Sequence, residues 1–460
     1  MATARYGDRV GTLEPYSIEH VPRAERHGRS RDLLWLWLAA NLTIADYALG
    51  FLPVSLGLPL GPTLAALAAG NLAGGALLAL AAAMGPPAGY PQMLIGRRAF
   101  GHVGGYGPAL LNWVSTAGWF TVNTILGAFA VQVLAPGCPF AAAALALVAA
   151  QVVLVVYGHN LIAAFERAMA ALLGVLFAAS TLLVLGHAGA LAAWHPALGA
   201  GRLWPLVGIV LAGAFSYIVS WGPYASDYSR YLPETTDPAH LAPAVFAGSV
   251  LASFWLEVLG ALIAILAPGQ SNAVAALASV LGAFGPFAVL AIILGASAAN
   301  ALNLYSNSLS ARALDLRWSR PVLVVLGGLL GLAFALAGAG DFTGFYSNFL
   351  LALDYWITPW LAVILVDFYL RGHRRPEGFG AAPAWNARGI GAYLLGLAAS
   401  VPLMSASLFR GPLAAAFGGA DLSYFVGFLV AGGAYLALTG RERRSEPESG
   451  RPPEGSAESR

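Results

Sequence analysis

The sequence contains little charge, no lysine and almost no cysteine. Only 10% of its 460 residues are charged and 58% are hydrophobic, whereas an ordinary soluble domain is roughly 25% charged. All 24 basic residues are arginine, and they nearly balance 22 acidic residues, leaving a net charge of +2. The single cysteine, Cys138, excludes an internal disulfide and a cysteine-based zinc site. This composition excludes a soluble protein and gives no sign of nucleic-acid binding.

Catalytic and nucleotide-binding motifs are also missing. The chain has no Walker motif, no H-E-x-x-H zinc motif and no G-x-S-x-G nucleophile motif, and its 8 histidines are scattered. We therefore expect no enzyme, no ATP-driven pump, no cofactor and no metal site. The N-terminal region has no apolar stretch followed by a cleavage site, so we expect no cleaved signal peptide.

Long apolar runs, separated by glycine, proline and charge clusters, fill most of the chain. A helix needs about 20 apolar residues to cross a bilayer. The runs lie near residues 33–56, 61–84, 107–134, 139–158, 161–186, 204–223, 240–267, 277–306, 320–339, 344–370, 388–409 and 418–439. We predict an all-α integral membrane protein of about twelve transmembrane helices within residues 33–440. Residues 1–32 precede them, and residues 441–460 are predicted to be a disordered tail because they contain no large apolar residue.

The arginines indicate which side of the membrane the termini face. Nearly all lie before the first predicted helix, in alternate loops or in the tail, and only Arg202 and Arg410 fall in the other loops. Arginine is enriched on the cytoplasmic side of membrane proteins. We therefore expect a multi-pass protein of the inner (cytoplasmic) membrane with both termini in the cytoplasm. Glu166, Asp227 and Asp367 fall near predicted cytoplasmic helix ends, where we expect them to meet water or arginine.

Two predicted helices contain residues that interrupt helical structure. The first includes an acid, a glycine and a proline within Asp46–Pro53, and the sixth includes Gly222-Pro223. Transporters built from inverted repeats interrupt corresponding helices of their two halves, where freed backbone groups bind substrate and ions. The separation of five helices favours repeats at about 33–186 and 204–370, with added helices at 388–439. Each break taken alone is equally well explained by a simple bend.

Aromatic and amide side chains share faces of three predicted helices. The pairs are three or four residues apart: Trp119 with Asn123, Tyr217 with Trp221, and Asn300 with Asn303. Asn307 extends the last of these faces. Tryptophan stacks on flat rings and asparagine offers both donors and an acceptor, so the combination suits a planar heteroaromatic ligand. For any single asparagine, a hydrogen bond to a neighbouring helix, worth about 1 kcal/mol, is the favoured alternative, whereas the combination of these residues favours a ligand.

Three carboxylates fall near the predicted middle of the membrane. They are Asp46, Glu257 and Asp354. A charged group costs about 2.5–3.5 kcal/mol to insert at this depth, so such groups are candidates for function. Asp46, which falls in the predicted unwound segment of the first helix, is the first candidate for a coupling proton or for a ligand N–H, and Glu257 is the second. Both also fit a structural role as hydrogen-bond acceptors for backbone amides or polar neighbours.

Three stretches together resemble the nucleobase:cation symporter-1 family, and most closely its purine-cytosine permease branch. They are Gly118–Asn123, Gly222–Pro233 and Asn303–Ser306, and the resemblance covers about residues 15–440. It implies a leucine-transporter-type fold of five-plus-five inverted repeats with two added helices. It also implies import of nucleobases, cytosine and/or purines, by alternating access coupled to a cation gradient.

The resemblance implies roles for several of the side chains already singled out. Trp119 resembles the stacking tryptophan of the family, and Asn123 resembles the amide one turn later that bonds the base. Asn300 and Asn303 match the substrate positions of the eighth helix, and Trp221 matches the aromatic residue before the Ser-Asp-Tyr motif. Tyr217, one turn before Trp221, is a candidate for closing the other face of the ligand.

One departure from the family pattern concerns the cation. Sodium-coupled members carry a Ser/Thr pair on the eighth helix, where this chain has Ala298 and Ala299, with Ser297 as the nearest hydroxyl. Na⁺ is a hard cation that needs oxygen ligands, so we favour H⁺ over Na⁺. The open alternatives are another planar heterocycle (uracil, allantoin, a hydantoin or a thiamine pyrimidine precursor), Na⁺ coupling, or an uncoupled facilitator.

Overall fold

The computed structural model describes residues 6–199, 201–270, 272–341, 355–372, 382–406 and 409–440. Within these ranges the chain is helical, and its one extended pairing is the isolated bridge between Ser405 and Arg410. Eight helices are long and apolar enough to cross a membrane, and a bent pair forms a ninth candidate span. Three shorter apolar helices follow toward the C-terminus: Tyr355–Leu370, Ala387–Leu403 and Ser423–Thr439.

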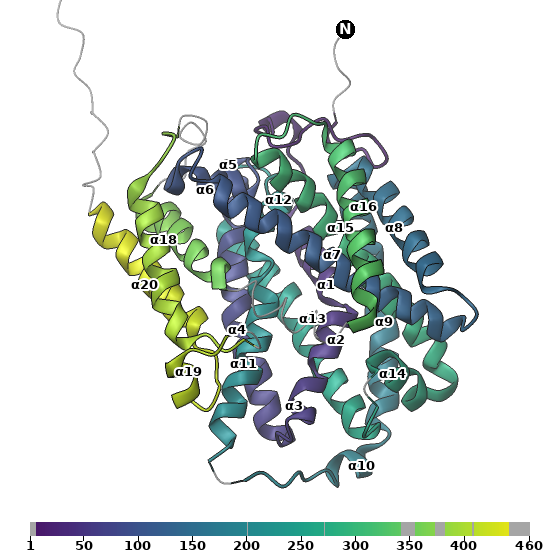
Figure 1. Ribbon diagram of the computed structural model, residues 1–460. Helices are drawn as coiled ribbons and strands as arrows, with labels where there is room; N and C mark the ends of the chain where they lie inside the picture. Colours follow the sequence, from purple (N-terminus) through teal and green to yellow (C-terminus); the bar gives the residue numbers. More distant parts are fainter. Residues whose placement is uncertain are drawn as a thin grey trace, which may run out of the picture.

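The longer helices form one bundle, with α18 and α20 along one side and α8 and α9 on the opposite side (Figure 1). Their bounds are α4 (Leu60–Ala82), α7 (Tyr106–Leu134), α8 (Phe140–Tyr157), α9 (His159–Leu185), α11 (Leu203–Val219), α13 (Pro238–Leu266), α15 (Gly285–Ala313), α16 (Arg320–Gly338), α18 (Ala387–Ser400) and α20 (Ser423–Thr439). Shorter elements connect them: η1 (Arg23–Glu25), α5 (Gly85–Ala88), α6 (Gln92–Phe100), α10 (Ala188–Ala192), α14 (Ala273–Leu281), η3 (Gly282–Phe284), η4 (Ala339–Asp341), η5 (Val366–Leu370), η7 (Val401–Leu403) and α19 (Pro412–Ala416).

The first span is broken, as predicted, but at a different residue. It consists of α1 (Ser30–Asn41), α2 (Ile44–Leu49) and α3 (Phe51–Ser55), with a 54° bend between α1 and the rest. The break falls at Leu42 and Thr43, because Thr43 adopts an extended backbone and its side chain accepts a hydrogen bond from the Asp46 N–H at 3.4 Å. Asp46 therefore sits in the first turn of α2 rather than in unwound chain, which corrects the prediction.

The second break lies where the sequence predicts it. Helix α11 ends at Val219, the short turn η2 (Gly222–Tyr224) follows, and α12 (Ala225–Ser229) resumes the span. Proline has no N–H to donate within a helix, so Pro223 interrupts the hydrogen-bond ladder here. The hydroxyl of Tyr217, near the end of α11, lies 2.8 Å from Thr43 Oγ1. This contact brings the two breaks together in the middle of the bundle.

Glycines hold the broken first span against its neighbours. A Cβ on Gly50 would meet the Glu257 carbonyl oxygen at 2.0 Å, and a Cβ on Gly260 would meet the Tyr47 carbonyl oxygen at 2.0 Å. A Cβ on Gly295 would meet the Leu42 carbonyl oxygen at 2.2 Å. Any larger residue at these positions would force the helices apart. Helices α13 and α15 therefore fix the positions of α2 and of the break.

Several helix bounds differ from the prediction for identifiable reasons. The run predicted at 277–306 is divided by a turn at Gly282, and α15 continues to Ala313 because its polar end is hydrogen-bonded, with Asn112 Nδ2 donating to Ser310 Oγ at 2.8 Å. Helix α18 ends at Ser400, just before a turn containing Pro402. Helix α20 begins at Ser423 rather than 418. Two predicted regions lie outside the described residues: the tail at 441–460, and residues 342–354, which include Asp354.

The N-terminal segment packs across one end of the bundle, beside α12 and the adjoining ends of α15 and α16 (Figure 1). Its centre is Glu14, which is fully buried and accepts hydrogen bonds from Tyr305 Oη at 2.8 Å, from Arg230 Nη2 at 3.2 Å and from Tyr231 Oη. Burial by itself raises the pKa of Glu14, but the Arg320 and Arg230 guanidiniums outweigh it and hold that pKa below its ordinary value. Glu14 thus ties residues from three spans to the N-terminal segment.

Replacing Glu14 by glutamine is expected to lower the free energy of unfolding by about 3 kcal/mol, because it leaves two buried guanidiniums without their counter-charge. The pKa of Glu14 is lowered in the folded state, so this stabilisation is present at neutral pH and is lost as pH falls through the folded pKa. Thermal unfolding in detergent measures the difference. The Glu19→Gln variant is the matched control, since the Glu19 side chain is 55% exposed and lies 3.7 Å from Arg312. Equal melting temperatures for the two variants would contradict the prediction.

Candidate functional site

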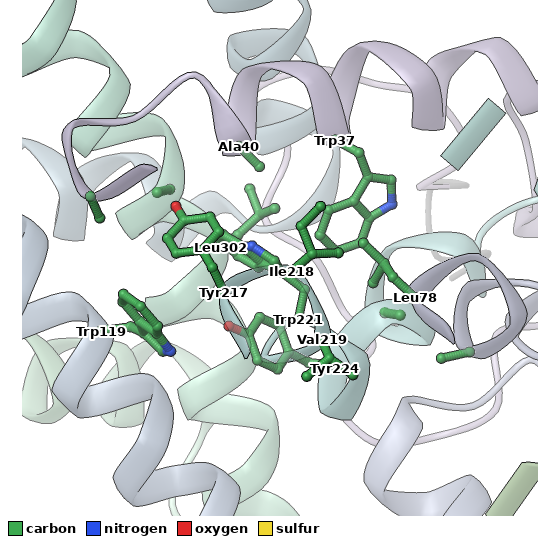
Figure 2. Close-up of a cluster of buried hydrophobic side chains, with 14 of the residues drawn as sticks. Trp37, Ala40, Leu78, Trp119, Tyr217, Ile218, Val219, Trp221, Tyr224 and Leu302 are labelled. Carbon is green, nitrogen blue, oxygen red and sulfur yellow. The ribbon is translucent and has the colours of Figure 1, made fainter. Parts of the chain in front are cut away.

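An aromatic pair marks the centre of the candidate site. Trp119 on α7 and Tyr217 on α11 meet edge to face, with ring centroids 5.4 Å apart and planes at 82°. Both side chains are buried, and Figure 2 shows them beside Tyr224 and Trp221. Because Tyr217 also contacts Thr43, the pair lies directly at the break of the first span. Two predicted site residues, on helices far apart in the sequence, are therefore neighbours.

The second break supplies two more aromatic rings. Trp221 packs against Trp37 of α1 at 5.6 Å and against Tyr224 at 5.5 Å between ring centroids, which Figure 2 shows within one buried cluster. The hydroxyl of Tyr224 donates to Asn303 Oδ1 at 3.0 Å. Tyr224 thereby links the break to α15 and to the predicted amide. Tyr224, Trp37 and Thr43 were missed from the sequence, although Tyr224 lies within the Gly222–Pro233 stretch already singled out.

Polar atoms remain without hydrogen-bond partners around these rings. Among the described residues, Asn123 Oδ1, Asn303 Nδ2 and Trp221 Nε1 are buried and have no partner. Leaving a buried polar group unpaired costs about 1–3 kcal/mol, so each of the three is a candidate for bonding a ligand. They amount to one acceptor and two donors beside aromatic rings. A flat ligand with polar edges would satisfy them.

The three asparagines of α15 lie three and four residues apart on one helix, but they bond to different neighbours. Asn300 Nδ2 donates to the Phe120 carbonyl oxygen at 3.0 Å, to Thr124 Oγ1 at 3.1 Å and to Gln151 Oε1 at 3.1 Å. Asn307 Nδ2 donates to the Trp113 carbonyl oxygen at 2.7 Å. The donors of both amides therefore fasten α15 to its neighbours, while Asn303 is turned to η2. Asn300 retains only its buried Oδ1, which has no partner among the described residues, for a ligand.

A second cluster contains the two predicted coupling carboxylates. Asp46 Oδ2 accepts a hydrogen bond from Ser253 Oγ of α13 at 2.9 Å, and Glu257, one turn along the same helix, accepts from Asn71 Nδ2 of α4. Both carboxyl groups are fully buried, and they lie within electrostatic reach of each other. The second oxygen of each, Oδ1 and Oε1, has no partner among the described residues. Two carboxyl groups in so dry a place cannot both be ionised, so the pair is suited to hold a proton.

The region around Ala298 and Ala299 provides few ligands for a hard cation. Both side chains are buried methyl groups on α15. Ser297, the nearest hydroxyl, donates to the Ile293 carbonyl oxygen at 3.0 Å and accepts from Gln151 Nε2 at 3.3 Å. Its oxygen is therefore engaged within α15 and with α8. In the part of the chain that the structure describes, no group of three or more His, Cys, Asp or Glu side chains is placed to hold a metal ion.

Solved structures show what kind of fold this is. The chain superposes on Mhp1, a nucleobase-cation-symport-1 family transporter in a closed conformation with bromovinylhydantoin bound, with a TM-score of 0.75, 20% identity and coverage of 93% of this chain and 95% of that one. The inward-facing conformation of Mhp1 gives a TM-score of 0.69 at 20% identity, with 94% of each chain covered. This likeness confirms the predicted all-α fold of the leucine-transporter type.

Sequence comparisons reach the same group of proteins. The chain is 30% identical over 441 residues to "Putative purine-cytosine permease YxlA" of Bacillus subtilis, covering 93% of this chain and 96% of the relative. It is 24% identical to the purine-cytosine permease fcyB of Emericella nidulans, covering 93% and 88%. The model of a family described as permease for cytosine/purines, uracil, thiamine, allantoin matches residues 20–427. The chain is therefore a membrane transporter, not an enzyme, and belongs to this family of permeases.

Proposed function

We propose that this permease imports cytosine and/or purine bases across the cytoplasmic membrane, coupled to an inward flow of protons. The observation that carries the proposal is the set of unpaired polar atoms on Asn123, Asn303 and Trp221 beside the rings of Trp119 and Tyr217. A nucleobase has a flat ring for stacking and an edge that carries both donors and acceptors. A nucleobase would therefore stack on the aromatic rings and bond the unpaired polar atoms at the same time.

Two features support protons as the coupling ion. The carboxyl groups of Asp46 and Glu257 are buried near each other without a basic partner among the described residues, so taking up or losing a proton changes their charge at low dielectric. Ala298 and Ala299 offer no side-chain oxygen to Na⁺. Asp46 lies one turn from the break where the substrate residues meet, so protonation and substrate binding act on the same segment.

The orientation proposed for the protein places its N-terminal end in the cytoplasm. The arginines concentrate before the first span and in alternate loops, as the positive-inside rule requires of cytoplasmic segments. Substrate then enters from the opposite end of the bundle. The Glu14 cluster closes the cytoplasmic end in this conformation.

Uptake of radiolabelled cytosine into transport-deficient cells expressing the chain tests this function, with and without a protonophore and with sodium or choline in the medium. We expect accumulation above equilibrium that the protonophore abolishes and that choline leaves unchanged. Loss of accumulation in choline would show sodium coupling, and equilibration without accumulation would show an uncoupled facilitator.

A second candidate substrate is another planar heterocycle, such as uracil, allantoin, a hydantoin or a thiamine pyrimidine precursor. The family description supports this alternative, because the family covers permeases for uracil, thiamine and allantoin as well as for cytosine and purines. An asparagine amide can also present either its donor or its acceptor to a ligand edge. Absence of cytosine uptake by protein that is confirmed in the membrane, with uptake of one of these compounds, would select this alternative.

A further inference from the structure

Glu166 is a buried carboxyl group that the site described above does not use. Its side chain is fully buried in α9, and neither Oε1 nor Oε2 has a hydrogen-bond partner among the described residues. Its neighbours on the same helix face, including Ile162, Ala170 and Leu173, are buried and apolar. The expectation that Glu166 meets water or arginine is therefore wrong, because α9 turns Arg167 outward and Glu166 inward.

No charged side chain on the helices that pack against α9 compensates Glu166 in the described part of the chain. Those helices are α1, α8, α13, α14 and α15, and α14 has no titratable residue. Four titratable groups on the other helices have different partners: Asp32 bonds Arg167, Tyr305 bonds Glu14, Glu257 bonds Asn71, and Arg312 bonds the Leu316 carbonyl oxygen. The remaining three are exposed: Arg31, Tyr157 and His240. On α9 itself, His159 contacts Asn160 and the Tyr228 carbonyl oxygen.

An isolated ionised carboxylate in such surroundings would cost many kcal/mol, so the group takes up a proton instead. A purely structural carboxyl would make at least one hydrogen bond, as Asp227 does with the Gln92 N–H at 2.9 Å and Asp367 does with Tyr435 Oη at 2.8 Å. Glu166 makes none of these. Among the described residues, Glu166 therefore has neither a hydrogen bond nor a counter-charge that would explain a carboxyl group at this place.

The position of Glu166 connects it to both the substrate site and the solvent. Helix α9 packs against α1, which leads into the first break, and against α15, which carries Asn303. Ala163 and Arg167, on the adjacent face of α9, line a cavity of about 290 Å³ together with Leu33 and Leu36 of α1. Glu166 does not line the cavity itself, but it lies between two residues that do, Ala163 and Arg167, about 10 Å along the helix axis from the start of α9. Separation of α9 from the helices around it would open a path from this cavity to the carboxyl.

We propose that Glu166 is a second proton-binding site of the transporter, which holds a proton in this conformation and releases it at the N-terminal end. Release breaks the carboxyl O–H bond and transfers the proton to water in the cavity, leaving a solvated carboxylate. Closure of the surrounding helices on α9 requires the proton to return, because the carboxylate cannot be buried alone. This inference rests on the proposed proton coupling. In each transport cycle Glu166 carries one proton in addition to the proton carried by the Asp46 and Glu257 pair.

The test compares wild type, Glu166→Gln and Ser180→Ala in proteoliposomes. Glutamine copies the protonated side chain, and Ser180 is a buried residue of the same α9 face whose hydroxyl bonds only the Leu176 carbonyl oxygen among the described residues. At a pH gradient of about one unit, loss of one coupled proton lowers the maximal accumulation ratio of cytosine about tenfold. We expect this loss in Glu166→Gln, with exchange of labelled for unlabelled cytosine retained, and no change in Ser180→Ala.

Infrared spectroscopy of the purified variants decides the protonation state without a substrate. The difference spectrum between wild type and Glu166→Gln at neutral pH should show the carbonyl band of a protonated carboxylic acid. Wild-type accumulation in Glu166→Gln, loss of its exchange activity, or absence of the band would each overturn the inference. If wild-type vesicles accumulate no cytosine, the proposed function fails, and the infrared band alone then decides whether Glu166 holds a proton.

Discussion

Replacing Asp46 by asparagine is expected to lower the maximal accumulation of the nucleobase about tenfold per unit of pH gradient, while exchange of labelled for unlabelled base continues. Asparagine keeps the hydrogen-bonding capacity of the protonated side chain, including an acceptor for Ser253 Oγ, but cannot release a proton. The pair with Glu257 would then have a fixed protonation state at this position through the whole cycle. In proteoliposomes with an imposed gradient of about one pH unit, the accumulation ratio should fall about tenfold from the wild-type value, because one coupled proton is lost and the proton of Glu166 remains.

The Ser253→Ala variant is the matched control for this prediction. It removes the hydrogen bond to Asp46 Oδ2 and keeps the carboxyl group. We expect it to retain accumulation, with a shifted pH dependence, because a lost hydrogen bond changes the proton affinity of Asp46 without removing the site. Wild-type accumulation in Asp46→Asn would assign the coupling proton to another group, of which Glu257 is the nearest.

Replacing Trp119 by alanine is expected to weaken nucleobase binding about tenfold to a hundredfold. Stacking of a base on an aromatic side chain is worth about 1–3 kcal/mol, and each 1.4 kcal/mol corresponds to tenfold in affinity. Trp119 is buried beside Tyr217 at the break, so its removal also deprives the tyrosine ring of its edge-to-face neighbour. Binding of cytosine to the purified protein, measured by calorimetry, gives the dissociation constant directly.

Trp113 offers a control on the same helix. It is only partly buried, and its backbone carbonyl, which a change of side chain leaves in place, accepts the bond from Asn307 Nδ2. The Trp113→Ala variant should therefore bind cytosine like wild type. An equal loss of affinity in both variants would point to a general disturbance of α7, and unchanged affinity in Trp119→Ala would remove the stacking role from this residue.

The class of protein and most of its helices follow from the sequence because a membrane-spanning helix needs a long apolar run. The runs at 107–134, 139–158 and 240–267 match α7, α8 and α13 within a few residues. The predicted helix ends are wrong where local composition is misleading. The polar residues Asn307–Ser310 look like a loop, but they continue α15 because α7 supplies hydrogen-bond partners such as Asn112.

The candidate site could be predicted only in part, because the sequence does not show which helix faces meet. Spacing places Trp119 with Asn123 on one face of α7, but it says nothing about what that face meets. The tertiary structure brings the ring of Trp119 on α7 to that of Tyr217 on α11, and the packing of α15 against α7 and α8 engages the donors of Asn300. Tyr224 was missed because a tyrosine in a turn has no periodicity to reveal its direction.

By itself, the sequence determined the membrane class, the rough places of most spans and the interruption of the sixth at Gly222-Pro223, because apolar length and proline act locally along the chain. It also predicted a break in the first span, but not its place at Leu42 and Thr43. Only the tertiary structure decided which polar groups meet. The contact of Asp46 with α13, the Tyr224 bond to Asn303 and the isolation of Glu166 each depend on residues that are distant in sequence. A buried side chain is paired or left unpaired by its neighbours in space, and helical spacing fixes only its own direction.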